Sequence, residues 1–535
     1  MTGERTASEG HNSQPSHSTP FILFLMATAV LCGALVMVIE IMGSRVIGPC
    51  YGVSLFVWTA LITVTLVALA AGYAAGGMLS DRHGSPDYLY GIIFIAGCLV
   101  LIIPLIKAMV LKQFLFLGLR SGALLSALLL FGPSLFLLGC VSPYIIKIAV
   151  REMSNIGRTV GVFYAISTVG SFLGTVATGF FLIAYAGVNR IFAGIGILLV
   201  VLAVSYFVFF RKRWAVLLLL LLPAVMPQAE LLRTKDLPNG TRVEEVFRKE
   251  GFYGMLKVLD YTYGKVHTRE LMIDGLIQGG IDMKDKLPVY EFFYFMEFLP
   301  YSLNPGGATC LVIGVGGGVV PVWYEQRGIR TDVVDINPDI ISIARDYFGF
   351  RVSGDVFIED ARYYLGRTKK QYDYIVLDVF NGDTTPGHIL SLEALQLLRL
   401  RMTPKGVVAI NVAGSLRQET FMTASVVRTL QQVFETVEVY PLFSPVEGDG
   451  FGNLAIIAYN YPRAEPDPGL TSKFPVHPMA REGVTKYIGR TFSFPPDTPA
   501  IVLTDDYNPI DFYDVWLKEK IRKDILANNP LDILI

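Results

Sequence analysis

Six long apolar segments dominate the first 210 residues of the chain. Each reaches the ~20 consecutive residues that a helix needs to cross ~30 Å of hydrocarbon. A hydrocarbon core contains no water to satisfy backbone groups, so segments of this kind form helices there. The sequence therefore predicts a multi-pass α-helical bundle in the cell (inner) membrane over residues 21–232. Its segments are 21–43, 54–79, 88–110, 122–148, 159–186 and 189–210.

Two flanking stretches complete this region. Residues 1–20 are polar and rich in Ser, Thr, His and Gly, so we expect a disordered tail. A seventh apolar run, "WAVLLLLLLPAVMP" at 214–227, is short for a span and contains Pro223. It fits an interfacial segment as well as a crossing, so the sequence predicts six to eight membrane segments.

Basic residues between the segments predict an orientation, because cytoplasmic loops carry an excess of Lys and Arg. With six crossings and the N-terminus inside, eight basic residues lie inside and five lie outside. The five are Arg45, Lys107, Lys112, Arg120 and Arg190. This arrangement leaves the C-terminal part of the chain in the cytoplasm, whereas seven crossings from the same start place it outside.

The rest of the chain has an ordinary soluble composition. Charged residues make up 17% of the whole chain, below the usual ~25%. The apolar part accounts for the difference, because it contains very few charged residues. The net charge of −1 gives no basic field for nucleic acid. The five cysteines form no CxxC pattern and the six histidines lack ligand spacing, so we expect neither disulfides nor a metal ion.

Periodicity divides the soluble part into two regions. Alternating stretches at 254–261, 264–271 and 271–278 predict a small antiparallel β layer over residues 240–300. Strand and helix patterns then alternate over residues 301–520, which predicts a parallel, doubly wound, Rossmann-like sheet of the methyltransferase type. The strand candidates are 309–314, 331–336, 354–358, 372–378, 406–412, 435–441 and 453–459. The helix candidates are 318–328, 338–348, 361–367, 391–402 and 418–433.

Ligands of such a sheet bind beyond the carboxyl ends of the strands. The loop "GVGGG" follows the first strand, and its glycines allow a tight turn and close approach of a ligand to the backbone. These glycines are Gly314, Gly316 and Gly318. Asp335 ends the next strand, where a carboxylate can accept both hydroxyls of a ribose.

Two further acids end the following strands. Asp360 and the amide of Ala361 are expected near an adenine, and Asp378 ends the strand "YDYIVLD". Asp378 also suits the N-cap of a following helix. The glycine loop contains no P-loop lysine, so strand-end acids in this order favour an adenosyl sulfonium over a dinucleotide.

Ordered motifs between about residues 245 and 440 resemble the spermidine synthase (polyamine aminopropyltransferase) family. "LMIDGLIQ" at 271–278 resembles the family signature "LxLDGxxQ". "LVIGVGGG", "VVDIN", "EDA" and "YDYIVLD" follow in family order. The full chain is similar to bacterial membrane-fused members, through "LDVFNGDTTPGHILSLEAL" at 377–395 and "LTDDYNPID" at 503–511.

The resemblance implies that an amine such as putrescine attacks the aminopropyl methylene of decarboxylated S-adenosylmethionine and releases methylthioadenosine. By position, it makes Asp378 the catalytic acid or base. Tyr290 then lines the amine channel, and Asp383 is a second acid beside the amine. The residues implied to bind the nucleoside are Gln278, Asp335, Asp360 and Ala361. We expect no metal cofactor, a lipid bilayer and polyamine as partners, no nucleic acid, and a homo-oligomer.

Three positions depart from the family pattern. Gly317 stands where the soluble enzymes have the acid that anchors the amino end of the cofactor. Gly254 replaces a glutamine that meets the nucleoside, and Glu291 replaces a histidine of many bacterial members. The acids that are candidates to restore the lost charge are Glu291, Asp383, Asp505 and Asp506.

Two alternatives remain open from the sequence. A methyltransferase that uses S-adenosylmethionine would suit Gly317, because a cofactor that keeps its carboxylate would be repelled by an acid there. A non-catalytic domain that senses a nucleoside or polyamine would suit a transporter-like bundle. The β layer with "DGLIQ" favours the aminopropyltransferase.

Overall fold

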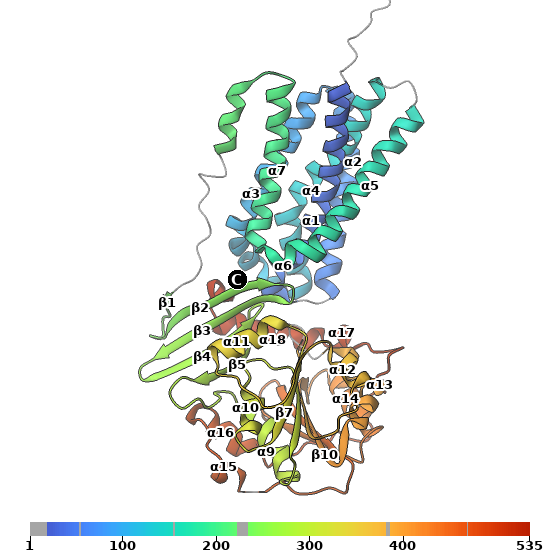
Figure 1. The fold of residues 1–535 in the computed structure, drawn as a ribbon. Coiled ribbons are helices and arrows are strands. Elements are labelled where there is room, and N and C mark those ends of the chain that lie inside the picture. The colour runs from blue at the N-terminus through green and yellow to red at the C-terminus, as the bar shows by residue number, and fades with distance from the viewer. Residues whose placement is uncertain are drawn as a thin grey trace, which may run out of the picture.

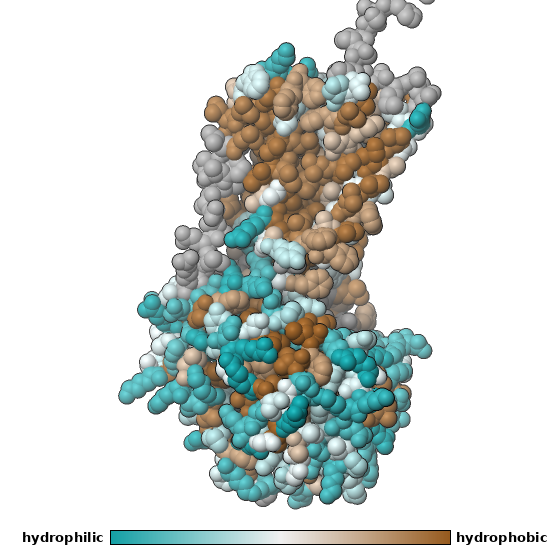
Figure 2. All heavy atoms as spheres, in the orientation of Figure 1, coloured by the Kyte–Doolittle hydropathy of each residue, from teal (hydrophilic) through white to brown (hydrophobic). Residues whose placement is uncertain are grey.

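The computed structural model describes residues 19–52, 55–152, 156–221, 234–380, 386–467 and 469–534. Long helices form a bundle at one end of the molecule, and two sheets with their covering helices form the other end (Figure 1). Hydrophobic side chains cover the visible face of the bundle, whereas hydrophilic side chains predominate on the sheet-containing part (Figure 2). The predicted division between an apolar and a soluble part is thus visible on the surface.

Each of the six predicted apolar segments is helical in the described part of the chain. Five stretches are long and apolar enough to cross a membrane, and one of them, Pro86–Val150, contains two helices that turn back at Leu115–Leu117. The helices of the bundle are α1 (Thr19–Tyr51), α2 (Leu55–Arg82), α3 (Pro86–Phe114), α4 (Gly118–Glu152), α5 (Ile156–Ala177) and α7 (Val188–Phe209). Helix α5 continues through a π-helical turn (Thr178–Leu182) into the short α6 (Ile183–Tyr185).

Glycines let the helices of the bundle approach closely. A Cβ atom at Gly170 of α5 would lie 2.1 Å from the carbonyl oxygen of Val30 in α1. A Cβ atom at Gly72 of α2 would lie 2.3 Å from the carbonyl oxygen of Phe136 in α4. Small residues at such crossings bring two backbones into contact, which is how helices associate where no hydrophobic effect drives them together.

The soluble part packs against one end of the bundle. The Arg45 guanidinium near the end of α1 donates to the carbonyl oxygen of Phe252. At the start of α4, the Leu119 N–H donates to Oε1 of Glu519 at 3.2 Å. The ends of α1 and α3 and the starts of α2, α4 and α7 therefore face the soluble part, and α7 ends at the opposite end of the bundle (Figure 1).

The sequence predicted six to eight membrane segments, and the case of six would put the soluble part where α7 ends, whereas it packs at the other end of the bundle (Figure 1). The chain instead passes from one end of the bundle to the other between Phe209 and Thr234, and a 3₁₀ segment, Trp214–Leu221, packs along α7 within that passage. Lys235 and Arg242 then join the five basic residues at the end that bears the soluble part. Among the described residues, each end then has seven basic residues near its helix ends, so the charge count favours neither orientation.

The predicted antiparallel β layer is confirmed as a five-stranded sheet in sequential order. Its strands are β1 (Thr234–Asp236), β2 (Arg242–Gly251), β3 (Gly254–Tyr263), β4 (Val266–Ile273) and β5 (Leu276–Asp282). The single strand predicted over 271–278 is wrong, because Asp274 and Gly275 form a hairpin turn there. Their φ angles of 47° and 80° are both positive, which is the conformation that Asp-Gly adopts in two-residue turns.

The second sheet has seven strands in the order β11-β12-β10-β9-β6-β7-β8. They are β6 (Thr309–Ile313), β7 (Arg330–Asp335), β8 (Val356–Ile358), β9 (Tyr372–Leu377), β10 (Met402–Ser415), β11 (Thr436–Pro441) and β12 (Phe451–Tyr459). The prediction of a parallel sheet is correct for β6 to β10 but wrong for β12, which is antiparallel to both β10 and β11. A short loop joins β11 to β12, whereas a parallel pair would need a long crossover.

Helices cover both faces of this sheet (Figure 1). The five predicted helices are confirmed as α10 (Val319–Glu325), α11 (Pro338–Tyr347), α12 (Ala361–Arg367), α13 (Leu392–Leu400) and α14 (Phe421–Gln431). Helices that the sequence analysis did not predict are α9 (Glu291–Leu303), α15 (Leu470–Lys473), α16 (Pro478–Tyr487), α17 (Ile510–Tyr513), α18 (Val515–Asn528) and α19 (Leu531–Leu534). Of these, α18 contacts both α1 and β10, so it lies between the bundle and the sheet.

The close contact between α1 and α5 predicts a stability difference between two glycine substitutions on one helix. Gly170→Ala should lower the free energy of unfolding by about 1–3 kcal/mol, because its Cβ would overlap Val30. Gly161→Ala is the matched control, since a Cβ atom there would meet nothing within 4 Å. Thermal unfolding of the detergent-solubilised full chain measures both, and equal midpoints for the two variants would contradict the packing.

Candidate active site

A cavity of about 610 Å³ lies where the carboxyl ends of the central strands face the bundle. Seven of the predicted site residues line it, and they come from β5, the glycine loop and the tips of β7, β8 and β9. They are Gln278, Gly314, Gly316, Asp335, Asp360, Ala361 and Asp378. The strand order that places β6 next to both β7 and β9 brings these tips together.

Asp335 links the glycine loop to the start of α11. Its Oδ2 atom accepts the Val315 N–H at 2.9 Å, and its Oδ1 atom accepts the Asn337 N–H at 2.8 Å. Burial raises the pKa of this carboxyl group, and the two backbone donors oppose that shift. Each carboxylate oxygen has a second lone pair, so a fixed Asp335 can still accept hydroxyl groups of a ligand.

Asp360 caps helix α12. Its Oδ1 atom accepts the Tyr363 N–H at 2.9 Å, and its Oδ2 atom lies 3.4 Å from Nε2 of His388. Ala361 follows as the first residue of the helix and is buried. His388 was not predicted as a site residue, although it lies in the quoted motif "TTPGHIL". Nothing in the sequence indicates that a single histidine in a loop lies beside Asp360.

Asp378 follows β9 and is partly exposed to the cavity. The Asn411 Nδ2 atom on β10 donates to its Oδ1 atom at 2.8 Å. Burial raises the pKa of Asp378 to about 6, and the hydrogen bond from Asn411 limits that rise. A carboxyl group with this pKa exchanges protons near neutral pH, which suits an acid or base.

Gly314 lies directly against Asp378. A Cβ atom at this position would lie 2.1 Å from the Asp378 carbonyl oxygen, and its φ angle is +86°. The close approach and the left-handed backbone both require glycine here. Gly318 has φ +77° but does not line the cavity, because a Cβ atom there would meet the Phe350 side chain at 2.7 Å.

Of the two predicted substrate residues, the structure describes Tyr290 alone. Tyr290 is not among the lining residues, since its side chain hydrogen-bonds to Glu270 and stacks on Phe292. Burial raises the pKa of Glu270 to about 7. Asp383 lies outside the described residues.

The described candidates for restoring the lost charge lie outside the cavity lining. Glu291, Asp505 and Asp506 do not line the cavity, and Asp505 forms an ion pair with Arg362 that lowers its pKa to about 2. Asp274 does line it, and its carboxylate occupies the space beside Gly254. A Cβ atom at Gly254 would lie 2.4 Å from Oδ2 of Asp274, which explains why no larger side chain stands at that departure from the family pattern.

The bundle and the C-terminal helix supply the remaining wall of the cavity. Their lining residues are Ser44, Arg45, Gly48 and Pro49 of α1, Trp58 of α2, and Ile521 and Ile525 of α18. Sequence reasoning could not have assigned them to the site, because they lie far from the strand motifs along the chain and carry no motif of their own.

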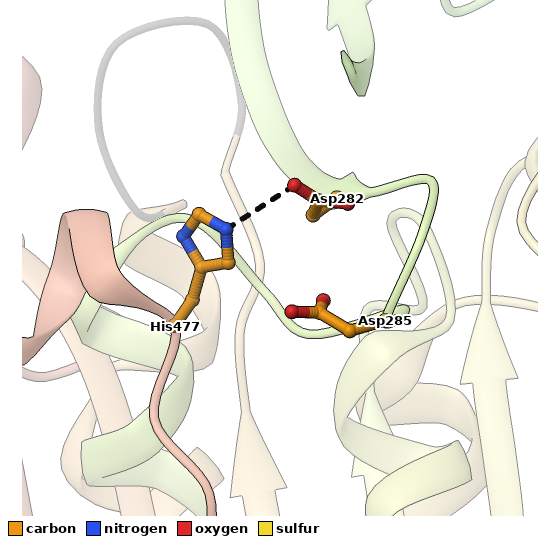
Figure 3. Close-up of side chains that lie close together, drawn as sticks. All are labelled: Asp282, Asp285 and His477. Atoms are coloured by element: carbon orange, nitrogen blue, oxygen red, sulfur yellow. Dashed lines mark hydrogen bonds and ion pairs between the residues drawn. The ribbon is translucent and has the colours of Figure 1, made fainter. Parts of the chain in front are cut away.

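One cluster away from this cavity has the composition of a metal site. Potential ligand atoms of Asp282, Asp285 and His477 lie within 4.8 Å of one another (Figure 3). The His477 Nδ1 atom accepts the Met479 N–H at 3.3 Å, so Nε2 carries the proton and donates to Asp282 at 3.3 Å. This tautomer leaves no imidazole lone pair for a metal ion, and the cluster instead joins the start of α16 to the end of β5.

The strand order and the strand-tip cavity define a Rossmann-like domain with an antiparallel β layer. Residues 294–460 match the family model of the spermine/spermidine synthase domain. This match confirms the resemblance drawn from the sequence motifs.

Characterised relatives fall into two enzyme classes. An N-terminal histidine N-methyltransferase of Emericella nidulans is 33% identical over 184 residues, which cover 32% of this chain and 33% of that protein. A polyamine aminopropyltransferase of Vibrio vulnificus is 33% identical over 137 residues, which cover 24% of this chain and 46% of that protein. The chain thus spans less than half the length of either relative.

A solved spermidine synthase in complex with the transition-state analogue AdoDATO is 18% identical to this chain. The match covers 51% of this chain and 94% of that chain, with a TM-score of 0.36.

The contact at Gly314 predicts a specific loss of nucleoside binding. Gly314→Ala should weaken binding of methylthioadenosine by about tenfold or more, because the new Cβ displaces the tip of β9. Gly328→Ala is the control, since its φ of +75° imposes the same backbone strain while its Cβ would meet nothing within 4 Å. Isothermal titration of the detergent-solubilised chain measures both, and equal losses would mean that backbone strain alone is responsible.

Proposed function

We propose that the protein is a membrane-bound polyamine aminopropyltransferase. The observation that carries this proposal is the Asp378 carboxylate, which faces a strand-tip cavity within a spermine/spermidine synthase domain. Decarboxylated S-adenosylmethionine supplies the aminopropyl group, and an amine such as putrescine accepts it. Gln278, Gly314, Gly316, Asp335, Asp360 and Ala361 are the proposed nucleoside-binding residues.

The proposed reaction is a direct displacement. The lone pair of a neutral amine forms a bond to the aminopropyl methylene carbon while the carbon–sulfur bond breaks. The sulfonium sulfur keeps the electron pair of that bond, and neutral methylthioadenosine leaves. The proton released from the new secondary amine passes to the Asp378 carboxylate. Holding the two reactants in line supplies much of the rate enhancement.

Carboxylates around the cavity support a cationic substrate. Asp274, Asp335, Glu359, Asp360 and Asp378 all line it. The sulfonium and the second ammonium group of a diamine are both stabilised by such surroundings. Gly318, Tyr290 and Asp383 stay proposed contributors from the family resemblance, and Tyr290 would act through its hydrogen bond to Glu270.

The site is proposed to face the cytoplasm, because adenosyl cofactors are made there. The long apolar helices support anchoring in the inner membrane. The N-terminus would then lie on the other side of the membrane, since the soluble part packs at the end of the bundle opposite to the start of α1 (Figure 1).

A methyltransferase is the second candidate. Gly317 leaves out the acid that the soluble aminopropyltransferases place beside the cofactor's amino end, and one relative with 33% identity is an N-methyltransferase. The full chain in detergent distinguishes the two, because stronger stabilisation by decarboxylated than by carboxylated S-adenosylmethionine supports aminopropyl transfer. The reverse preference would support methyl transfer.

Asp378→Asn should lower kcat for methylthioadenosine release by about 10²–10⁴-fold, because the amide cannot accept the proton. The amide has the shape of the carboxyl group, so the thermal midpoint should change little. Asp346→Asn, on the exposed side of α11, is the control and should keep full activity. Unchanged release by Asp378→Asn would remove this residue from the mechanism.

The pH dependence of kcat/KM gives an independent test. The rate should rise as the pH increases through about 6, because Asp378 must be deprotonated to accept a proton. Asn411→Ala should move this acidic limb to higher pH, since the carboxylate loses the hydrogen bond that lowers its pKa. If the acidic limb lies at the same pH in this variant, the limb reports the titration of a group other than Asp378.

A further inference from the structure

Helix α1 is longer than a bilayer crossing requires. Its 33 residues give a length of ~50 Å, against ~30 Å of hydrocarbon. The last turns of α1 thus extend toward the membrane surface, and there Ser44, Arg45, Gly48 and Pro49 form one wall of the cavity. If the bundle lies in a membrane, the cavity lies at the membrane–water boundary.

A buried arginine fixes this wall to the rest of the site. The Arg522 Nη1 atom of α18 donates to the Pro49 carbonyl oxygen at 3.0 Å and to the Asp274 carbonyl oxygen at 3.2 Å. Arg522 is only 1% exposed. The end of α1 and the β4–β5 turn are therefore held together around the cavity. The end of α1 is thus a structural part of the site and does not serve only to attach the soluble part to the bundle.

The acids and the arginine of the described cavity lining come from different elements, and Arg45 is near enough to Asp274 to oppose the rise that burial causes in the pKa of that carboxyl group. Arg45 is the one Lys or Arg among the described lining residues, and it stands on the bundle side. Its guanidinium donates to the Phe252 carbonyl oxygen and has further N–H groups for an anion. All five acids of the lining come from the β4–β5 turn and the tips of the second sheet. A soluble diamine has two cationic ends, so Arg45 would repel whichever end approached it.

Two aromatic residues share the cavity lining with Arg45. Phe252 is 54% exposed and Trp58 is 37% exposed, although both line the cavity. Aromatic residues are enriched at both surfaces of a membrane, where their rings lie at the level of the headgroups. The cavity lining thus combines the guanidinium of Arg45 with aromatic surface from α2 and from the turn between β2 and β3.

We propose that the acceptor is an aminoethyl phosphodiester presented by the bilayer, which is the headgroup chemistry of an aminophospholipid. This inference rests on the proposed aminopropyl transfer. Arg45 binds the phosphodiester, the aromatic residues contact the lipid backbone, and the amine reaches Asp378 among the acids. The amine nitrogen then forms the bond to the aminopropyl carbon, methylthioadenosine leaves, and the proton passes to Asp378.

The test uses the full chain reconstituted in vesicles with decarboxylated S-adenosylmethionine. Vesicles of phosphatidylethanolamine and phosphatidylcholine should support methylthioadenosine release, and mass spectrometry should find phosphatidylethanolamine heavier by one aminopropyl group. Vesicles of phosphatidylcholine alone should not, because that lipid has no nucleophilic amine. Parallel arms add putrescine or free phosphoethanolamine to the phosphatidylcholine vesicles.

Each vesicle experiment tests a different part of the two proposals. Release with putrescine but not with phosphatidylethanolamine overturns the lipid acceptor and leaves the proposed function intact. Release with free phosphoethanolamine at least as fast as with the lipid overturns presentation by the bilayer. Release with no amine at all overturns both proposals.

Arg45→Gln should raise KM for phosphatidylethanolamine about tenfold or more, with kcat changed much less. Arg82→Gln, at the end of α2 away from the cavity, is the matched control and should keep the original KM. Thermal midpoints check that both variants fold. An unchanged KM in a folded Arg45→Gln variant overturns the role of this residue.

Discussion

The guanidinium of Arg522 makes the contact on which the cavity depends. It satisfies the Pro49 carbonyl, which cannot be bonded within α1 at the helix end, and the Asp274 carbonyl in a tight turn. A charged group buried at this position is stable only with such partners, because losing either one would leave a desolvated polar group. The walls that the bundle and the sheets contribute to the cavity are therefore parts of one structure.

Local patterns predicted the elements of the fold well. The six apolar segments, the central strands and five helices on the second sheet all appear close to their predicted ranges. The wrong predictions concern strands whose length or direction is determined by the turn or loop that connects them. The Asp274–Gly275 turn divides what reads as one alternating strand, and the short loop before β12 reverses a strand whose composition resembles its parallel neighbours.

The candidate site was predictable where a motif ends a strand. Asp335, Asp360 and Asp378 meet at one cavity because parallel strands place their carboxyl ends together. Asn411, His388 and Arg45 were missed, since nothing in a single sequence indicates that a residue of β10, a loop histidine and a helix end lie beside these acids. Tyr290 is the opposite case. It matches the position of a substrate residue in the family, but its side chain does not line the cavity.

The cavity joins two segments that lie far apart in the sequence, since Ser44–Pro49 and Ile521–Ile525 contribute to its lining and Arg522 hydrogen-bonds to Pro49. The ribosome makes the first of these segments nearly five hundred residues before the second. The bundle is therefore made while the pocket is still open, and synthesis of α18 then supplies the missing part of the lining. A chain that stops before α18 would keep the strand-tip carboxylates but would lack the part of the wall that encloses them.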